Sequence, residues 1–310
     1  MAVSEIFRTE KKEQELKDFF ARRKNVLVAF SGGVDSSLLA AVAAETPGLK
    51  VLAVTVSSPL VPERELENAR KIAADIGVSH ILLEKRMLDM KGIRKNELNR
   101  CFVCKKEIME SLIQIAKDQG FEAVVDGTNY SDVMGTVSRP GYNAILEINN
   151  NSDFKIQMPY VELQITKDDI RKMSKKRKVL SSDKPSMSCL ATRFTYDTVL
   201  TPELLKTIDT AEEMMVKCGF SQIRIRCHID SERRKFARIE INNSEMEKLF
   251  DSTPCNGSGV SGVSGISSGS VGSSGSNGLK IQSVIDFLKK SGFSYVTLDL
   301  EGFRSGSMDL

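Results

Sequence analysis

The sequence predicts an α/β protein: a Rossmann-like parallel sheet covered by helices, followed by a smaller α+β domain. Two observations support this fold class. Up to Asp126, short apolar runs alternate with helical segments, as in parallel sheets whose two faces are both covered. After about residue 200 the apolar residues instead alternate with period two, which is typical of half-buried strands. We therefore expect one domain over residues 1–198 and a second over 199–310.

The composition is that of an ordinary globular protein. The chain has 310 residues, of which 41% are hydrophobic and 27% charged, and its net charge is +3. This charge is too small to demand a nucleic-acid partner. No run reaches the roughly 18 apolar residues of a membrane span, and the charged N-terminus lacks the apolar core of a signal peptide. We therefore expect no membrane partner and a cytoplasmic location.

The elements of the first domain follow one another in a regular order. Strands are expected at 26–30, 50–56, 80–83 and 122–126. Helices are expected at 4–23, 35–45, 62–76 and 101–120. Ligands of such sheets bind at the carboxyl ends of the strands. "SGGVDSS" (31–37) and "DGTN" (126–129) both fall at such ends, so we expect a binding site there.

The second domain is expected to contain two helices and three strands. The helices are placed at 201–218 and 283–293, and the strands at 221–229, 235–241 and 295–300. A segment between them, residues 257–278, contains eight glycines and nine serines among its 22 residues. Such a composition cannot bury enough apolar surface to become ordered. We expect a disordered insertion over 256–279 that carries no chemistry.

The stretch "SGGVDSS" has the features of a phosphate-binding turn. A helix that starts directly after a strand directs free backbone N–H groups and partial positive charge at one point. Two glycines allow an anion close to the backbone, and the serines add donors. Asp35 suits either the N-cap of the helix or a Mg²⁺ ligand. The residues concerned are Ser31, Gly32, Gly33, Asp35, Ser36 and Ser37. The alternative is a plain strand–turn–helix junction.

Three cysteines form the second candidate site. Cys101 and Cys104 make a C-x-x-C in "RCFVCKK", and Cys189 lies in "KPSMSCLATRF". A redox pair, half of a zinc site and part of an iron–sulfur site are all open. No second C-x-x-C exists and the chain has two histidines, which argues against zinc. Three thiolates can hold three irons of a [4Fe–4S] cluster and leave the fourth iron open. Three unrelated cysteines remain the alternative.

The order of residues in "SGGVDSS" resembles the S-G-G-x-D-S signature of the PP-loop ATP pyrophosphatase superfamily. Over most of its length the chain also resembles the LarE family of sulfurtransferases within that superfamily, and the Gly/Ser insertion lies outside the resemblance. The matching motifs are "SGGVDSS", "RCFVCKK", "VVDGTN", "KPSMSCLATRF", "IRIRCH", "ARIEI" and "YVTLDLEGFRSGSM". Thr195 and Asp197 depart from the family's usual proline and glycine, so we expect that loop to differ.

The resemblance implies an activity with ATP and Mg²⁺ as cofactors. ATP adenylates a carboxylate of pyridinium-3,5-biscarboxylic acid mononucleotide, and sulfide displaces AMP to give a thiocarboxylate, in the biosynthesis of the nickel-pincer nucleotide cofactor. Asp126, Thr128 and Asn129 would lie beside the ATP loop. Lys105 would neutralise phosphate, or alternatively face solvent. The family also tends to form homo-oligomers.

LarE proteins come in two kinds, and the cysteines decide between them. One kind has a single cysteine, at the position of Cys189, and gives up its own sulfur. The other has the additional C-x-x-C and uses a [4Fe–4S] cluster. This sequence has the second pattern, so the resemblance implies that Cys101, Cys104 and Cys189 are catalytic and bind the cluster. Sacrificial donation from Cys189 is the alternative.

A substrate that carries phosphate and carboxylates needs cations that bind anions in a two-pronged geometry. Four arginines of the matching motifs would supply them: Arg193, Arg224, Arg226 and Arg304. Glu240, in "ARIEI", also matches a functional position of the family, and we expect all five residues to bind the substrate. For Arg224 and Arg226 the alternative is a solvated strand face. Other functions within the superfamily are tRNA thiolation, amidation by a ligase, and nucleotide binding without catalysis.

Overall fold

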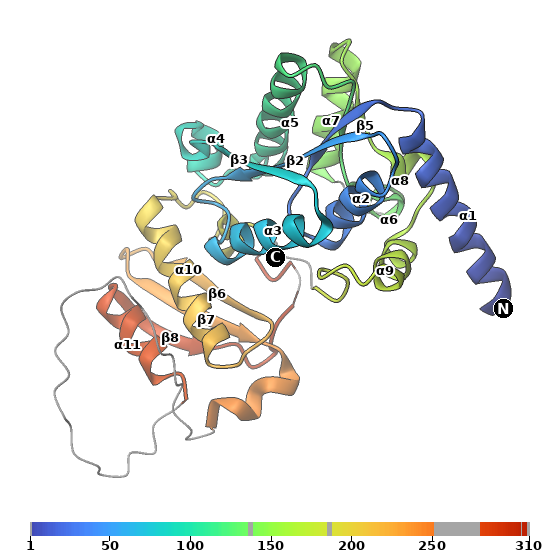
Figure 1. Ribbon diagram of the computed structural model, residues 1–310. Coiled ribbons are helices and arrows are strands. Elements are labelled where there is room, and N and C mark those ends of the chain that lie inside the picture. Colours follow the sequence, from blue (N-terminus) through green and yellow to red (C-terminus); the bar gives the residue numbers. More distant parts are fainter. Residues whose placement is uncertain (1, 136–138, 185–187, 251–279, 305, 309–310) are drawn as a thin grey trace. The chain divides into compact units, whose positions relative to one another are not determined.

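The computed structural model describes residues 2–135, 139–184, 188–250, 280–304 and 306–308 (Figure 1). The chain divides into two compact units, Met1–Cys189 and Leu190–Leu310. The expected insertion at 256–279 lies outside the described residues. The assignment of an ATP-binding domain to 1–198 and a substrate or oligomerisation domain to 199–310 stays a prediction.

The first unit is built on a five-stranded sheet with the order β3-β2-β1-β4-β5, and all neighbouring strands are parallel. The strands are β1 (Asn25–Ala29), β2 (Lys50–Ser57), β3 (Ser79–Glu84), β4 (Val124–Val125) and β5 (Ile156–Gln157). This confirms the predicted parallel α/β fold. Strand β5 was not predicted, because a two-residue strand has no periodicity to detect.

Helices cover both faces of this sheet (Figure 1). They are α1 (Ala2–Ala21), α2 (Val34–Ala44), α3 (Glu63–Ile76), α4 (Lys91–Arg94), α5 (Arg100–Asp118), α6 (Tyr130–Met134), α7 (Pro140–Asn151), α8 (Pro159–Glu162) and α9 (Lys167–Lys176), with a 3₁₀ turn at Met87–Asp89. Successive residues of β1 face opposite ways: Val26 and Val28 pack with α1, α2, α3 and α9, whereas Leu27 packs with α5 and α7. Two hydrophobic cores therefore enclose the sheet.

The strand order places the candidate site. From β1 the sheet extends through β2 to β3 on one side and through β4 to β5 on the other. The carboxyl ends of β1 and β4 are thus neighbours at a topological switch point, where doubly wound sheets bind ligands. The loops that follow these two strands contain "SGGVDSS" and "DGTN".

The second unit contains a three-stranded sheet of β6 (Ile223–Ile229), β7 (Lys235–Ile241) and β8 (Phe293–Leu298). Strand β7 is antiparallel to β6 and parallel to β8. The helices are α10 (Pro202–Lys217) and α11 (Gln282–Lys290), with 3₁₀ turns at Leu190–Arg193 and Asn243–Phe250. Alternation along β6 separates apolar Ile223, Ile225 and Cys227 from polar Arg224 and Arg226 on the opposite face.

Across the part of the chain that the structure describes, no helix combines the length and apolarity needed to cross a bilayer.

Asp169 anchors α9 to α1. Its carboxylate accepts a hydrogen bond from the Thr166 N–H (3.0 Å) in a capping box, and Lys12 Nζ of α1 lies 2.9 Å from it. Burial disfavours the charge, but Lys12 and Thr166 outweigh that effect and lower the pKa of Asp169 to about 2. The carboxylate therefore contributes stability above its ordinary pKa of 3.8, and this contribution is lost as the pH falls through 2.

Asp169→Asn is expected to lower the free energy of unfolding at pH 7 by about 1 kcal/mol, because it removes the negative charge that Lys12 and the capping box stabilise. The difference from wild type should shrink as the pH approaches 2. Denaturant titrations across this pH range measure it. Asp168→Asn is the control, because Asp168 is exposed; equal losses in both variants would contradict the assignment.

Candidate functional site

The "SGGVDSS" loop folds on itself between β1 and α2. The Ser36 hydroxyl accepts a hydrogen bond from the Ser31 N–H (3.1 Å) and donates to the Gly33 carbonyl (3.2 Å). The Ser31 hydroxyl accepts from the Gly33 N–H at 3.3 Å. Gly33 is the N-cap of α2 and has no side chain to cover the first-turn N–H groups. These N–H groups and the helix dipole point to the region after β1, where the sequence predicts an anion, and this role stays a prediction.

Gly32 brings this loop against α3. Its φ is +67°, and a Cβ added there would lie 2.9 Å from the Ala69 Cα. Gly127 plays a similar part after β4, because a Cβ at that position would lie 3.2 Å from the Ser36 backbone nitrogen. Close backbone approach excludes a side chain at Gly32 and leaves little room for one at Gly127, and Gly127 brings the loop after β4 against the first turn of α2.

Asp35 lies in the first turn of α2 and makes its contacts through the carboxylate. Lys167 forms an ion pair with it, and the Asn129 amide donates to it at 3.4 Å. Burial raises the pKa of Asp35, and Lys167 offsets part of this rise. Because Gly33 is the N-cap, the N-cap role considered for Asp35 is wrong. The alternative role of Asp35, a Mg²⁺ ligand, stays a prediction.

A second acidic residue, Asp126, follows directly after β4. Lys105 Nζ lies 2.6 Å from its carboxylate, which also accepts hydrogen bonds from the Thr128 N–H (3.0 Å) and hydroxyl. Burial opposes ionisation, but Lys105 and Thr128 outweigh it and lower the pKa of Asp126. The solvent-facing alternative for Lys105 is therefore wrong, since its ammonium is bound to a buried carboxylate.

The three cysteines of the sequence hypothesis lie near one another. Cys101 and Cys104 occupy the first turn of α5, and Cys189 is the last residue of the first unit. Burial raises the pKa of Cys104 to about 12, and negative charge on Cys189 and Cys101 raises it further. Cys104 and Cys189 also line one cavity.

The thiols have the donor chemistry of an iron–sulfur site but are not assembled around an ion. Within the described ranges, no group of three or more His, Cys, Asp or Glu side chains has the arrangement of a metal site. Cys104 and Cys189 line one cavity, and Cys101 lies one helical turn before Cys104. Three thiol ligands have the chemistry that an iron–sulfur cluster needs, and ligation would require them to release their protons.

A cavity of about 420 Å³ connects these groups, which is large enough for a nucleotide. Its polar lining comprises Ser31, Asp35, Ser36, Thr55, Ser58, Glu65, Cys104, Lys105, Asp126, Thr128, Asp132 and Cys189. An adjacent cavity of about 280 Å³ shares Ser31, Asp35 and Cys189 and adds Lys167 and Lys184. A third cavity, of about 520 Å³ beside α1, contains none of the motif residues. The first unit thus brings the phosphate loop and two of the cysteines to one space.

Two cations of this site were not predicted. Lys167 contacts Asp35, from which it is separated by 132 residues. Lys184 Nζ lies 2.6 Å from the Glu65 carboxylate and 3.4 Å from the Gly32 carbonyl. Lys184 begins the motif "KPSMSC", so its place shortly before Cys189 could have indicated that it belongs to the site. No pattern in the sequence marks Lys167.

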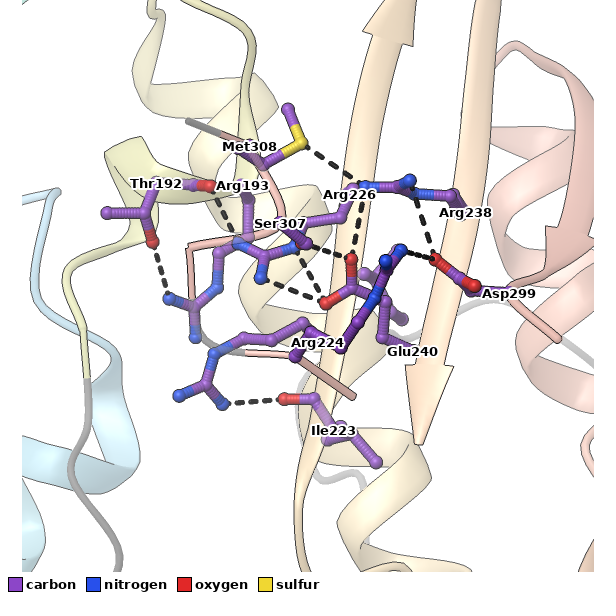
Figure 2. Close-up of polar contacts among 12 residues, drawn as sticks. Thr192, Arg193, Ile223, Arg224, Arg226, Arg238, Glu240, Asp299, Ser307 and Met308 are labelled. Carbon is purple, nitrogen blue, oxygen red and sulfur yellow. Dashed lines mark hydrogen bonds and ion pairs between the residues drawn. The ribbon is translucent and has the colours of Figure 1, made fainter. Parts of the chain in front are cut away.

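In the second unit, one face of the sheet carries two of the predicted arginines, Arg224 and Arg226 (Figure 2). Arg224 pairs with Glu240 in the β6–β7 register, and Arg226 pairs with Arg238, so all four share a face; we call these residues the arginine face. Arg226 Nε and Nη2 donate to Glu240 Oε2 at 3.0 and 2.9 Å. Arg238 was not predicted, although its spacing of two from Glu240 indicates the shared face.

Arg224 and Arg226 are only 3% and 4% exposed, so the alternative of a solvated strand face is wrong. The Arg224 guanidinium donates to the Ile223 carbonyl (2.6 Å) and lies 5.1 Å from the centre of the Phe303 ring. Arg304 pairs with Asp299 and Glu301 (3.5 and 2.7 Å). Burial of guanidinium groups beside several carboxylates indicates an ordered polar network.

Arg193 differs from the other predicted arginines. It is fully buried, and its Nε and Nη2 donate to the two carboxylate oxygens of Glu212 at 2.9 and 3.0 Å. Glu212 also accepts from the Ile225 N–H. A substrate role for Arg193 stays a prediction. In the loop that follows, Asp197 adopts a φ of 61°, a left-handed conformation that glycine adopts readily.

The fold and the phosphate loop define the class: an α/β nucleotide-binding protein of the PP-loop type. The asparagine synthase family model matches residues 16–90. An uncharacterised protein of Synechocystis is 33% identical over 300 residues, or 97% of each chain. An uncharacterised protein of Methanocaldococcus jannaschii is 30% identical over 295 residues, or 95% of this chain and 96% of that one.

A third relative has a named activity. Pyridinium-3,5-bisthiocarboxylic acid mononucleotide synthase of Lactiplantibacillus plantarum is 29% identical over 287 residues, or 92% of this chain and 89% of that one. The chain belongs to the LarE family of ATP-using PP-loop enzymes.

Gly32→Ala is expected to lower the free energy of unfolding by about 2 kcal/mol or more and to weaken ATP binding at least about tenfold, because both the φ and the contact with Ala69 exclude a Cβ. Gly48→Ala is the matched control: its φ is +77°, but nothing lies within 4 Å of the added atom. It should cost about 1 kcal/mol and leave ATP affinity unchanged. Denaturation and calorimetric ATP titration test both variants; unchanged ATP affinity in Gly32→Ala would contradict the close approach.

Glu212→Ala should destabilise the protein by about 3–5 kcal/mol, because it leaves the Arg193 guanidinium buried without its carboxylate. Glu213→Ala, at the neighbouring exposed position, should change stability by less than about 0.5 kcal/mol. Denaturant unfolding measures the difference. Equal stability of the two variants would mean that Arg193 does not depend on this pair.

Proposed function

We propose that the protein is an ATP-dependent sulfurtransferase that acts on pyridinium-3,5-biscarboxylic acid mononucleotide in nickel-pincer nucleotide biosynthesis. The observation that carries the proposal is that Cys104 and Cys189 line the same cavity as the phosphate loop. An activated acyl group formed at that loop would then lie beside sulfur chemistry. The named Lactiplantibacillus relative supports the choice of substrate.

The first step activates a carboxylate. A carboxylate oxygen attacks the α-phosphorus of ATP, a new P–O bond forms, and the bond to the bridging oxygen breaks to release pyrophosphate. The N–H groups at the start of α2 would bind the departing phosphates. Asp35 would hold Mg²⁺, while Lys167 and Lys184 would supply further positive charge. Since Lys167 is paired with Asp35, it must exchange this partner when the cation binds.

The second step replaces oxygen by sulfur. Sulfide attacks the acyl carbon, a C–S bond forms, the C–O bond to phosphate breaks, and AMP leaves. A [4Fe–4S] cluster bound by Cys101, Cys104 and Cys189 would supply the sulfide through its open iron. Asp126 holds Lys105, the residue that follows Cys104, and thereby fixes the start of α5 relative to the phosphate loop. If Cys189 alone gave up its sulfur, Cys101 and Cys104 would have no role in the reaction.

The arginine face would bind the anionic groups of the substrate. Arg224 and Arg226 are buried and held in place by backbone carbonyls and Glu240. Arg304, which pairs with Asp299 and is partly exposed, would add a further cation. Glu240 orients Arg226 through two hydrogen bonds, which is a positioning role. A homo-oligomer and a cytoplasmic location stay predictions, and the proposal requires no nucleic acid.

The test is anaerobic incubation of the iron-loaded protein with this mononucleotide, ATP and sulfide. We expect AMP, pyrophosphate and a product whose mass reflects exchange of oxygen for sulfur, together with about four irons per chain. Cys101→Ser, Cys104→Ser and Cys189→Ser should lose iron and repeated turnover. Cys227→Ala is the control, since Cys227 lies on the opposite, apolar face of the second sheet.

Each negative outcome has a distinct meaning. Release of AMP without a sulfur-containing product would exclude sulfur transfer. Repeated turnover by iron-free protein would exclude the cluster. A single turnover that persists in Cys101→Ser and Cys104→Ser but not in Cys189→Ser would identify sacrificial donation.

A further inference from the structure

Three buried nitrogen atoms at the arginine face have no hydrogen-bond partner among the described residues. They are Nε of Arg238, Nε of Arg304 and Nε2 of His228. The Arg238 and Arg304 side chains reach solvent elsewhere, with exposed fractions of 25% and 39%, but these particular atoms are covered. Buried donors without partners are costly, and three of them together indicate a missing acceptor.

The strand register places these residues close together. Arg238 pairs with Arg226, and His228 lies two residues beyond Arg226 on β6, so its side chain emerges on the same face. Burial lowers the pKa of His228, and the charges of Arg238 and Arg226 lower it further, which places the imidazole within electrostatic reach of both guanidinium groups. These effects favour the neutral imidazole, which has one N–H donor.

The carboxylates of this region are already engaged (Figure 2). Glu240 accepts from Arg226, from Arg238 (3.1 Å) and from the Ser307 hydroxyl (2.5 Å). Asp299 pairs with Arg238 Nη1 (3.4 Å) and with Arg304. Arg238 is thus held through Nη1 and Nη2, which fixes its guanidinium, while its Nε has no partner among the described residues.

We propose that Arg238 and His228 bind the phosphate monoester of the mononucleotide substrate, together with the arginines already assigned to substrate binding. This inference rests on the proposed function, whose substrate carries that phosphate. A carboxylate would favour the two-pronged edge of one guanidinium, and that edge of Arg238 is occupied. A tetrahedral anion such as phosphate has several acceptor oxygens, so it can accept single hydrogen bonds from separate side chains.

The test is calorimetric titration of the whole protein without ATP. The ligands are pyridinium-3,5-biscarboxylic acid mononucleotide, its dephosphorylated nucleoside and ribose 5-phosphate. Arg238→Lys retains the positive charge for Glu240 and Asp299 but lacks Nε. His228→Leu removes the ring nitrogen, whereas His228→Gln restores a donor. Arg234→Lys is the control, because Arg234 lies on the same hairpin and pairs with Asp230.

Arg238→Lys and His228→Leu should each weaken binding of the two phosphorylated ligands about tenfold and leave the nucleoside affinity unchanged. His228→Gln should recover most of the affinity, and Arg234→Lys should match wild type. The inference is overturned if the nucleoside is weakened equally, if neither variant has an effect, or if Arg234→Lys loses as much as Arg238→Lys.

The two proposals can fail separately. If wild type neither binds nor converts the dicarboxylic mononucleotide, yet binds ribose 5-phosphate with the same dependence on Arg238 and His228, the proposed function fails and the phosphate site stands. If wild type forms the thiocarboxylate while both variants bind the mononucleotide normally, the phosphate site fails and the function stands. The His228 variants test the site independently should Arg238→Lys not fold.

Discussion

Close approach of backbone to backbone at Gly32 and Gly127 is the constraint on which the nucleotide-binding region depends. At these two positions a single added carbon would meet α3 or the first turn of α2. Because the loops after β1 and β4 can approach so closely, Asp35 and Asp126 line one cavity. The parallel sheet makes the carboxyl ends of β1 and β4 neighbours. Gly127 then allows the loop after β4 to approach the first turn of α2.

Charges in this cavity are balanced within the protein before any ligand arrives. Asp35 is paired with Lys167, Asp126 with Lys105, and Glu65 with Lys184. Half-buried charges of this kind require partners, since an unpaired one would be costly. The same pairs keep the site in a defined geometry. Binding of a nucleotide with its cation therefore amounts to an exchange of ionic partners, which needs less reorganisation than the assembly of a new site.

In the second unit, several guanidinium groups gather on one face of the sheet and require partners. Glu240 and Asp299 each serve two arginines, and residues near the C-terminal end, Phe303, Ser307 and Met308, add a ring, a hydroxyl and a sulfur contact. The arginines are thereby held in place before a ligand binds. The few donors that this network leaves unsatisfied are the ones to which we assign a phosphate.

Local patterns in the sequence determined the fold class, the phosphate loop, the cysteine set and the period-two strands, because each depends on residues that are near neighbours in the chain. Tertiary structure alone decided the contacts between distant residues: Lys167 with Asp35, Lys105 with Asp126 and Arg193 with Glu212. It also decided that Arg224 and Arg226 are buried, since periodicity reports that two side chains share a face but not what covers that face. Ion pairs leave no periodic signal, because they require only that two side chains meet in the folded chain.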